Sequence, residues 1–550
     1  MGVHRSRHYA ILMVVMASLT LPNLGTPSFF DVDEGVNAEA AREMLEKGTW
    51  ISPLFNFELR TAKPALLYWL QMTSYAVFGV NEFAARFPSV LLSLGTVLLV
   101  YELARRMFGA IGGLLAGVIL ASAIEFCMLA HAATPDATLL FFSVLTYYLF
   151  WIGSRDGGRS WFIPCGMAAG LAMLTKGPVG LAMPATVVFL YLLWNRELKR
   201  LLDRRLLWGI LAFILVAAPW YILVTVETRG AWIRAFIGRE NVTRFMQPME
   251  NHRGPIFYHL AGIMVLFAPW SIFLGVTIWY AIKKSRERTE VVETTNDRDA
   301  CRFLLCWVGT YLFFFSLAAT KLPNYVLPVY PALAILTARL LERWRTGDLI
   351  LPRWVMPSSV AGLAIVGLVT GFGLALAGGL IPLPGLKMRY FPGIEQWLWI
   401  GTIPLVGAGL ATYYLMRQRR NALIACVSVC SWVFVALIAA FPVTTLDQYK
   451  APRQLVADAG VQQSHRDIRL LALQWFQPSV VFYSRREVER IQNWDQASPA
   501  LAMNHPVYMF VPEPVWAKIQ EEQPQARGYR TIAQKYDFLR NCDILVVTNQ

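Results

Sequence analysis

The sequence lacks the features on which most soluble enzymes depend. It contains no glycine-rich phosphate loop, no catalytic-triad pattern, no internal repeat and no low-complexity tract. There are only 7 cysteines, and their spacing resembles neither a disulfide framework nor a zinc site, because all but Cys542 lie in or beside apolar runs. We therefore expect neither a nucleotide-dependent enzyme nor a small disulfide-bonded fold.

Charge is absent from long stretches of the chain. Residues 354–380 and 421–441 contain no Asp, Glu, Lys or Arg, and 56% of all 550 residues are hydrophobic. The mean hydropathy of +0.44 and the 19 tryptophans are typical of a polytopic membrane protein with aromatic belts at two interfaces. Apolar runs of membrane length predict about thirteen helical spans. They are expected near residues 9–27, 85–106, 111–128, 134–153, 160–173, 176–194, 205–226, 256–282, 301–319, 325–343, 354–380, 396–416 and 421–441.

The basic residues are concentrated in connections between the predicted spans. A net charge of +14 would indicate a nucleic-acid partner in a soluble protein. Here every dense basic cluster falls in connections on the same side as the N-terminus, which the positive-inside rule places in the cytoplasm. We therefore predict no nucleic-acid partner, and an uncleaved first span with a cytoplasmic N-terminus. The clusters are Arg105–Arg106, Arg155 with Arg159, Arg196–Arg205, Lys283–Arg298, Arg339–Arg353 and Arg417–Arg420.

The connections on the other side have a different composition. Acids, lone cations, histidines and proline turns gather there, so we expect the functional site on the outer face. After Pro442 the sequence becomes polar, which predicts a membrane domain over 1–442 and an extracytoplasmic α/β domain over 443–550. Strands are expected at Ile468–Leu473, Ser479–Tyr483, Val507–Val511 and Ile544–Val547, and helices at Ala451–Ala459 and Val515–Gln520.

The first outer connection opens with carboxylates. Asp33 and Glu34 precede a helical pattern that Gly48 is expected to end. Asp33 could act as a base or as an electrostatic partner at a reacting centre. Alternatively, Asp31 or Asp33 only caps the helix, because Asp31 and Glu34 have capping-box spacing. Asp136, at the start of a later span, is a second candidate acid or a simple partner of the helix N-terminus.

Several cations lie at outer boundaries, against the general bias. Each could bind a lipid phosphate and stabilise its departure, or could serve only a structural or interfacial role. These cations are Lys63, Lys176 and Lys321, each near a proline, and Arg239, Arg244 and Arg253 in the connection from 227 to 255. His252 and His259 are possible metal ligands.

Together these motifs resemble a known series. Asp33-Glu34, Lys63-Pro64, Ala85-Arg86-Phe87-Pro88, Thr134-Pro135-Asp136, Thr175-Lys176-Gly177-Pro178 and Lys321-Leu322-Pro323-Asn324-Tyr325 are similar to the motifs of GT-C glycosyltransferases. The resemblance is greatest to the bacterial aminoarabinose transferases (the ArnT group). Those enzymes move 4-amino-4-deoxy-L-arabinose from undecaprenyl phosphate to lipid A, a lipopolysaccharide modification linked to polymyxin resistance. The resemblance to this group covers residues 5 to 345 well.

The resemblance implies roles for individual residues. Asp33 would be the principal catalytic carboxylate, with Glu34 beside it and Asp136 as a second acid. Lys63 would bind the donor phosphate. Further donor-phosphate or lipid contacts would come from Arg86, Arg244, Arg253, Lys321 and Tyr325. No resident cofactor is implied, although a divalent metal stays open.

Two alternatives stay open on the sequence. The chain could be another polyprenyl-phosphate-dependent GT-C transferase, because protein O-mannosyltransferases share the acidic first loop. It could also be a lipid or sugar transporter, but transporters place ionisable groups within the membrane and often contain repeated halves, and neither feature is visible. The resemblance favours an inverting transferase in the bacterial inner membrane, whose partners are the lipid-linked sugar, a lipid acceptor and membrane lipids.

Overall fold

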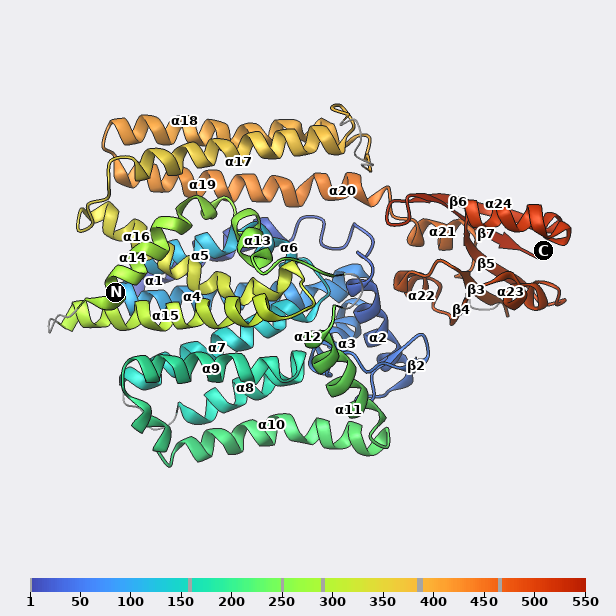
Figure 1. The fold of residues 1–550 in the computed structure, drawn as a ribbon, viewed down its shortest axis with the longest axis horizontal. Helices are drawn as coiled ribbons and strands as arrows, with labels where there is room; N and C mark the ends of the chain where they lie inside the picture. Colours follow the sequence, from blue (N-terminus) through green and yellow to red (C-terminus); the bar gives the residue numbers. More distant parts are fainter. Residues whose placement is uncertain (1, 157–160, 249–251, 288–291, 383–388, 463–466) are drawn as a thin grey trace.

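The computed structural model describes residues 2–156, 161–248, 252–287, 292–382, 389–462 and 467–550. A bundle of long helices occupies most of the molecule, and a compact α/β unit packs against one end of it (Figure 1). The N-terminus lies at the opposite end of the bundle (Figure 1). This arrangement places α2 (Asp33–Lys47), α3 (Leu66–Phe78) and the short strands β1 (Leu54–Phe55) and β2 (Glu58–Leu59) between the bundle and the α/β unit.

The helices follow the predicted apolar runs closely. The bundle helices are α1 (Gly2–Thr20), α4 (Glu82–Phe108), α5 (Ala110–Ala121), α6 (Ile124–Ala130), α7 (Pro135–Asp156), α8 (Phe162–Lys176), α9 (Val179–Trp194), α10 (Leu206–Glu227), α13 (Tyr258–Leu266), α14 (Leu274–Arg286), α15 (Val292–Leu317), α16 (Tyr330–Thr346), α17 (Val355–Ala377), α18 (Thr402–Met416) and α19 (Arg420–Ala440). In the described residues, eight helices are long and apolar enough to cross a membrane, or up to ten if each bent pair is one span. The chain is a multi-pass membrane protein.

Two of the predicted spans are broken rather than straight. α5 and α6 are bent by 69°, and α13 is bent by 114° from the helical segment Trp270–Arg286. Hydropathy alone cannot detect such breaks, because both halves remain apolar. The first helix lies nearer the N-terminus than predicted, since α1 spans Gly2–Thr20 and the chain then continues without regular structure to α2.

The shorter helices lie mostly at the end of the bundle that faces the α/β unit. They are α2 (Asp33–Lys47), α3 (Leu66–Phe78), α11 (Ala231–Ala235), the π-helix η2 (Phe236–Thr243) and α12 (Arg244–Met246), with the two-residue strands β1 (Leu54–Phe55) and β2 (Glu58–Leu59). The 3₁₀ segments are η1 (Leu198–Leu202), η3 (Trp270–Phe273), η4 (Pro323–Val329), η5 (Ile394–Gly401) and η6 (Pro524–Gly528).

The predicted helix after Asp33 is confirmed. Gly48 ends α2 with φ of 67°, a left-handed conformation that glycine adopts without strain, and its N–H binds carbonyls of the last turn. Asp33 and Glu34 lie at the positive N-terminal end of this helix and Lys47 at its negative end. The helix is buried continuously from Glu34 to Met44, so it is covered by protein on nearly all sides.

The C-terminal residues form a five-stranded mixed sheet in the order β4-β3-β5-β7-β6. β3 pairs in parallel with β4 and β5, whereas β7 pairs antiparallel with β5 and β6. The strands are β3 (Arg469–Leu473), β4 (Val488–Ile491), β5 (Val507–Pro512), β6 (Arg530–Asp537) and β7 (Cys542–Thr548), and the helices are α20 (Pro442–Asp447), α21 (Pro452–Asp458), α22 (Pro478–Ser484), α23 (Trp494–Leu501) and α24 (Glu513–Glu522). Every residue of β5 is buried, as expected of a central strand covered on both faces.

One strand prediction in this region is wrong. Ser479–Tyr483 lies inside the helix α22, with Pro478 at its first turn. The run is short and apolar, and periodicity cannot distinguish a buried strand from a buried helical turn at this length. α22 packs on α2, so its position bears directly on the first outer loop.

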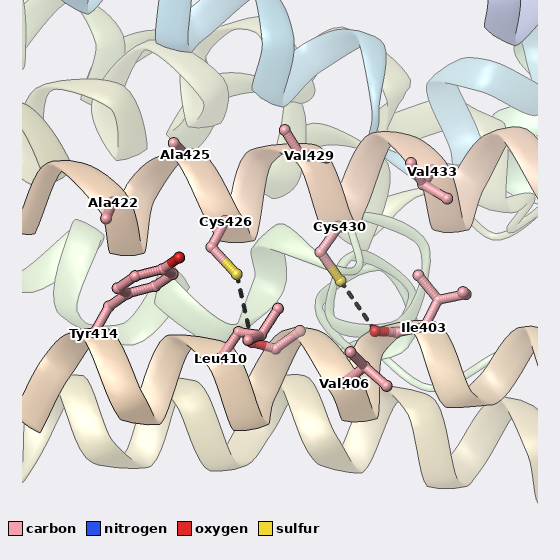
Figure 2. Close-up of a pocket in the computed structure, with 11 residues that line it drawn as sticks. Ile403, Val406, Leu410, Tyr414, Ala422, Ala425, Cys426, Val429, Cys430 and Val433 are labelled. Atoms are coloured by element: carbon pink, nitrogen blue, oxygen red, sulfur yellow. Dashed lines mark hydrogen bonds between the residues drawn. The ribbon is translucent and has the colours of Figure 1, made fainter.

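An apolar groove of about 550 Å³ lies between α18 and α19 (Figure 2). The thiols of Cys426 and Cys430 lie along it and donate to the carbonyls of Gly407 and Ile403. None of the predicted site residues lines this groove.

Candidate functional site

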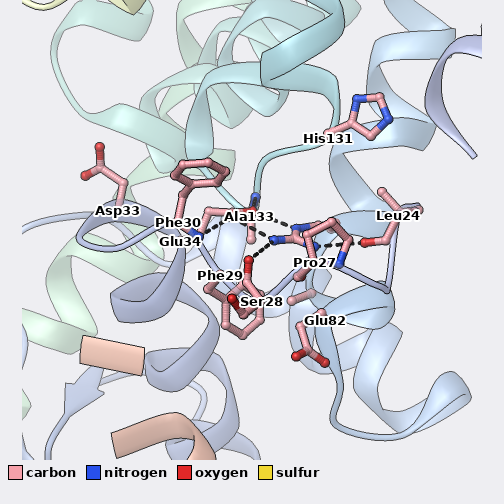
Figure 3. Close-up of polar contacts among 12 residues, drawn as sticks. Leu24, Pro27, Ser28, Phe29, Phe30, Asp33, Glu34, Glu82, His131 and Ala133 are labelled. Carbon is pink, nitrogen blue, oxygen red and sulfur yellow. Dashed lines mark hydrogen bonds and ion pairs between the residues drawn. The ribbon is translucent and has the colours of Figure 1, made fainter. Parts of the chain in front are cut away.

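The side chains of Asp33 and Glu34 point in opposite directions, although they are neighbours at the start of α2 (Figure 3). Asp33 is exposed, and among the described residues its carboxylate has no hydrogen-bond or ion-pair partner. Glu34 is buried at 4% exposure. Asp33 is therefore free to meet a ligand, whereas Glu34 is part of the protein interior.

Glu34 and Arg86 form a closed, buried ion pair. Arg86 Nε lies 2.8 Å from Glu34 Oε1, and Arg86 Nη2 lies 2.9 Å from Glu34 Oε2. The remaining Arg86 donors bind backbone carbonyls at Leu24, Pro27 and Ser28. Burial alone would raise the pKa of Glu34, but Arg86 and two backbone N–H groups lower it below its usual value. Both side chains are thus occupied within the protein, which favours a structural role over the catalytic role predicted for Glu34 and the phosphate-binding role predicted for Arg86.

Asp31 points to the α/β unit and not along α2. Its carboxylate accepts from the backbone N–H of Ser479 at 2.9 Å and from the Ser479 hydroxyl. α2 has no side-chain cap, so the interpretation of Asp31 and Glu34 as a capping box is wrong. Desolvation raises the pKa of Asp31 to about 7, and the bonds from Ser479 and the charge of Lys450 oppose that rise.

Lys63 is a half-buried cation among other cations. Burial lowers the pKa of Lys63 to about 8, with further lowering by Lys176, Arg244 and Arg60, while Asp33 acts in the opposite direction. No ion pair or hydrogen bond of its ammonium occurs within the described part of the chain. The structure thus brings residues from three separate connections close enough to affect one another, and leaves Lys63 available to an anion.

Asp136 is a buried residue of this site whose carboxylate accepts hydrogen bonds from two side chains. Lys176 Nζ donates to Asp136 Oδ1 at 2.7 Å, and Asn324 Nδ2 donates to Asp136 Oδ2 at 3.2 Å. Lys176 Nζ also lies 5.7 Å from the centre of the Tyr325 ring. Asp136 is buried at 5% exposure, so it orients Lys176 and does not face solvent.

Arg244 borders the same cluster. Its Nη1 lies 3.5 Å from the Tyr325 hydroxyl, and its Nη2 lies 3.5 Å from a carboxylate oxygen of Glu240. The structure therefore places Arg244 and Tyr325 together with Lys176 and Lys63. Arg60 also belongs here, through bonds from its guanidinium to Tyr68 and Asn37.

Sequence reasoning missed Arg60 and Asn324 as site residues. Asn324 could have been found, because it lies in the quoted Lys-Leu-Pro-Asn-Tyr turn. Arg60 lies in none of the quoted motifs, although it precedes Lys63 by only three residues.

Lys321 has a different role from the one predicted. Its ammonium donates to the carbonyls of Ser316 at 2.7 Å and Ala318 at 2.9 Å, at the C-terminal end of α15. A buried lysine that binds the last carbonyls of a helix is a helix cap. We therefore withdraw its assignment to the donor lipid. Arg253 is exposed, without a partner among the described residues.

Among the residues that the structure describes, neither ring nitrogen of the fully buried His259 has a hydrogen-bond partner. Across the described ranges, no group of three or more His, Cys, Asp or Glu residues could hold a metal ion.

Comparison with known proteins identifies the family. Residues 62–222 match the family model described as dolichyl-phosphate-mannose-protein mannosyltransferase. A Pseudomonas aeruginosa protein named undecaprenyl phosphate-alpha-4-amino-4-deoxy-L-arabinose arabinosyl transferase is 30% identical over 463 residues, which cover 82% of this chain and 79% of that protein. The chain belongs to this transferase family.

An Erwinia tasmaniensis protein of the same name is 33% identical over 345 residues, which cover 60% of this chain and 59% of that protein. For several relatives, the Erwinia protein included, the chain covers less than two thirds of their length. The crystal structure of ArnT from Cupriavidus metallidurans bound to undecaprenyl phosphate is 23% identical, covers 99% of this chain and 98% of that chain, and has a TM-score of 0.80. The predicted polytopic GT-C fold of the ArnT family is thereby confirmed.

Proposed function

We propose that this ArnT-family protein transfers 4-amino-4-deoxy-L-arabinose from undecaprenyl phosphate to lipid A. The observation that carries the proposal is the juxtaposition of an unpartnered carboxylate, Asp33, with an unpartnered ammonium, Lys63, in a cluster of further cations. A lipid-linked sugar phosphate needs this combination, because negative charge develops on the leaving phosphate while positive charge develops at the sugar. The names of the relatives specify the donor.

The transfer is a substitution at the anomeric carbon. An oxygen of the acceptor forms a bond to this carbon while the bond to the donor phosphate oxygen breaks, and undecaprenyl phosphate leaves with the electron pair. Attack from the face opposite the leaving group inverts the anomeric configuration. Lys63 stabilises the departing phosphate, with Arg244, Arg253 and Tyr325 as additional donors from the same side.

Asp33 acts on the sugar end of the donor. A lipid A phosphate is already ionised and needs no general base, so Asp33 orients the sugar and binds its amino group. Asp136 contributes indirectly, because its ion pair fixes the ammonium of Lys176 beside Tyr325. The proposed step calls for no resident organic cofactor, since the donor itself supplies the leaving group.

We propose the bacterial inner membrane as the location, with the N-terminus in the cytoplasm. The basic clusters support this orientation, because they occur in connections on the side of the N-terminus. The α/β unit lies at the end of the bundle opposite the N-terminus (Figure 1), and in this proposal that end, with the site, faces the periplasm. In this proposal residues 1–442 form the transferase domain and residues 443–550 a periplasmic domain.

The proposal is tested with purified protein in proteoliposomes that contain undecaprenyl phosphate-aminoarabinose and lipid A. Mass spectrometry should show lipid A that has gained one pentosamine, and Asp33→Asn and Lys63→Ala proteins should lose this product. Arg419→Gln is a matched control, because Arg419 is an exposed basic residue between α18 and α19. Wild-type protein that leaves lipid A unmodified would refute the proposal, as would full activity in both site variants.

A second candidate is a GT-C transferase that glycosylates protein or another glycan. The match of residues 62–222 to a protein mannosyltransferase model favours it. The same proteoliposomes, supplied with polyprenyl-phosphate mannose and an acceptor peptide, distinguish the two: only one donor should be consumed.

A further inference from the structure

The carboxylate of Asp33 has no partner that would fix its position. It is exposed and makes no hydrogen bond or ion pair within the described residues, so its direction depends entirely on the backbone that carries it. On its C-terminal side that backbone is held by Glu34, through the buried pair with Arg86. The structure shows an equally specific attachment on the N-terminal side.

That attachment is Asp31, and its partner belongs to the α/β unit. Both bonds to Asp31 come from Ser479, at the start of α22 and 448 residues later in the sequence. Gly35 makes this approach possible. A Cβ at position 35 would lie 2.5 Å from Asp31 Oδ1 and 2.9 Å from the Ser479 nitrogen, so only glycine allows α22 to pack this close.

The residues just before Asp31 are held by the same unit. The N–H and hydroxyl of Ser28 donate to Asp447 at 2.8 and 2.6 Å, and Lys450 donates to the carbonyl of Ser28 at 2.7 Å. The N–H of Phe29 donates to the hydroxyl of Tyr483 at 3.1 Å.

The Phe29 ring also contacts the α/β unit, edge-on against Phe482 with their centres 4.8 Å apart. One hydrophobic core includes residues of α2, α3, α21, α22 and the sheet. The loop before Asp33 is thus built into the C-terminal unit.

We propose that the C-terminal α/β unit positions the catalytic loop, and that Asp31 and Ser479 are positioning residues for Asp33. This inference rests on the proposed function. The unit holds residues 28–31 so that Asp33 faces Lys63. Displacement of a reacting group by about 1 Å can cost about a hundredfold in rate. Loss of the attachment should therefore lower kcat far more than it weakens donor binding, because Lys63 still holds the donor phosphate.

The test uses full-length protein in proteoliposomes. Asp31→Asn and Ser479→Ala should each lower kcat about tenfold or more while KM for the lipid-linked donor stays within twofold. Ser479→Thr keeps the hydroxyl and should retain most of the activity. Ser484→Ala is the matched control, because the Ser484 hydroxyl lies on the same helix but binds only the carbonyl of Val481.

Gly35→Ala provides an independent perturbation. Alanine favours a helix over glycine by about 1 kcal/mol, but here the added methyl group must push α2 and α22 apart, so Tm is measured beside kcat. The kcat of Gly35→Ala should fall as in Asp31→Asn, because the added methyl group occupies the space between Asp31 and Ser479. Gly409→Ala is the control, since a Cβ there meets no atom within 4 Å.

Hydrogen–deuterium exchange gives a readout apart from activity. Exchange should rise at residues 28–36 in Asp31→Asn and Ser479→Ala, with the membrane helices unchanged. Wild-type kcat in both variants, or a fall in kcat accompanied by equal losses in KM and thermal stability, would overturn the inference. A wild-type protein without transfer activity would instead refute the proposed function, and exchange would still report whether the attachment exists.

Discussion

Replacing Lys63 with glutamine removes a cation from the proposed phosphate site and keeps a side chain of similar length. Among the described residues Lys63 has no carboxylate partner, so the substitution leaves no acid unpaired. A hydrogen bond to a charged group contributes about 1.5–3 kcal/mol. At about 1.4 kcal/mol for each factor of ten, kcat/KM for the donor should fall about tenfold to 150-fold.

The pH dependence gives a sharper form of the same prediction. The pKa of Lys63 is lowered to about 8, first by burial and then by neighbouring cations. Lys63 is therefore charged below about pH 8 and loses its proton as the pH rises through that value. Since kcat/KM reports groups of the free enzyme, it should fall about eightfold between pH 7.5 and pH 9. Lys63→Arg keeps its charge at all these values and should abolish this fall.

The assay is initial-rate transfer in proteoliposomes across pH 6.5 to 9.5, with the donor well below KM. A wild-type fall in kcat/KM that persists unchanged in Lys63→Arg would refute the assignment, because the titrating group would then lie elsewhere. Activity of Lys63→Gln within twofold of wild type would refute it as well.

Three further substitutions separate structural from functional groups. Arg86→Met leaves Glu34 buried without its partner and should destabilise the protein by about 3–5 kcal/mol, seen as a lower Tm in detergent. Adding Glu34→Gln should recover part of the loss. An unchanged Tm in Arg86→Met would contradict the structural role of the pair. Asp136→Asn removes the ionic partner of Lys176 and should slow transfer about tenfold to hundredfold, whereas wild-type rates would show that this pair is dispensable. Asp33→Asn should leave Tm unchanged, because the carboxylate is exposed, and lower turnover about a hundredfold or more; a parallel loss of Tm would contradict the absence of packing contacts.

The membrane architecture could be predicted well from the sequence. Residues 354–380 lack charge over a length that spans a bilayer, and a helix forms there because a bilayer offers the backbone no other hydrogen-bond partners. The ends of α2 were predictable for local reasons, since Gly48 permits a left-handed residue after the last turn. The breaks at α5–α6 and α13–η3 were not, because packing and not hydropathy sets them.

The candidate site could be predicted only in part. Motifs placed Asp33, Lys63 and Asp136 at the same end of the bundle, and the structure brings their surroundings together. The assignments of Arg86 and Lys321 to the donor could not be judged from sequence. A cation at a membrane boundary has the same signature whether it meets a substrate phosphate or a backbone carbonyl.

The amino-acid sequence by itself determined the membrane class, most of the helices and the position of three neighbouring acids just before and at the start of one helix. Only the tertiary structure decided what each acid does. Asp31 accepts hydrogen bonds from Ser479, Glu34 forms an ion pair with Arg86, and Asp33 has no side-chain partner among the described residues. The physical reason is that the state of a carboxylate depends on which donors and how much water surround it, and these donors come from segments distant in the chain.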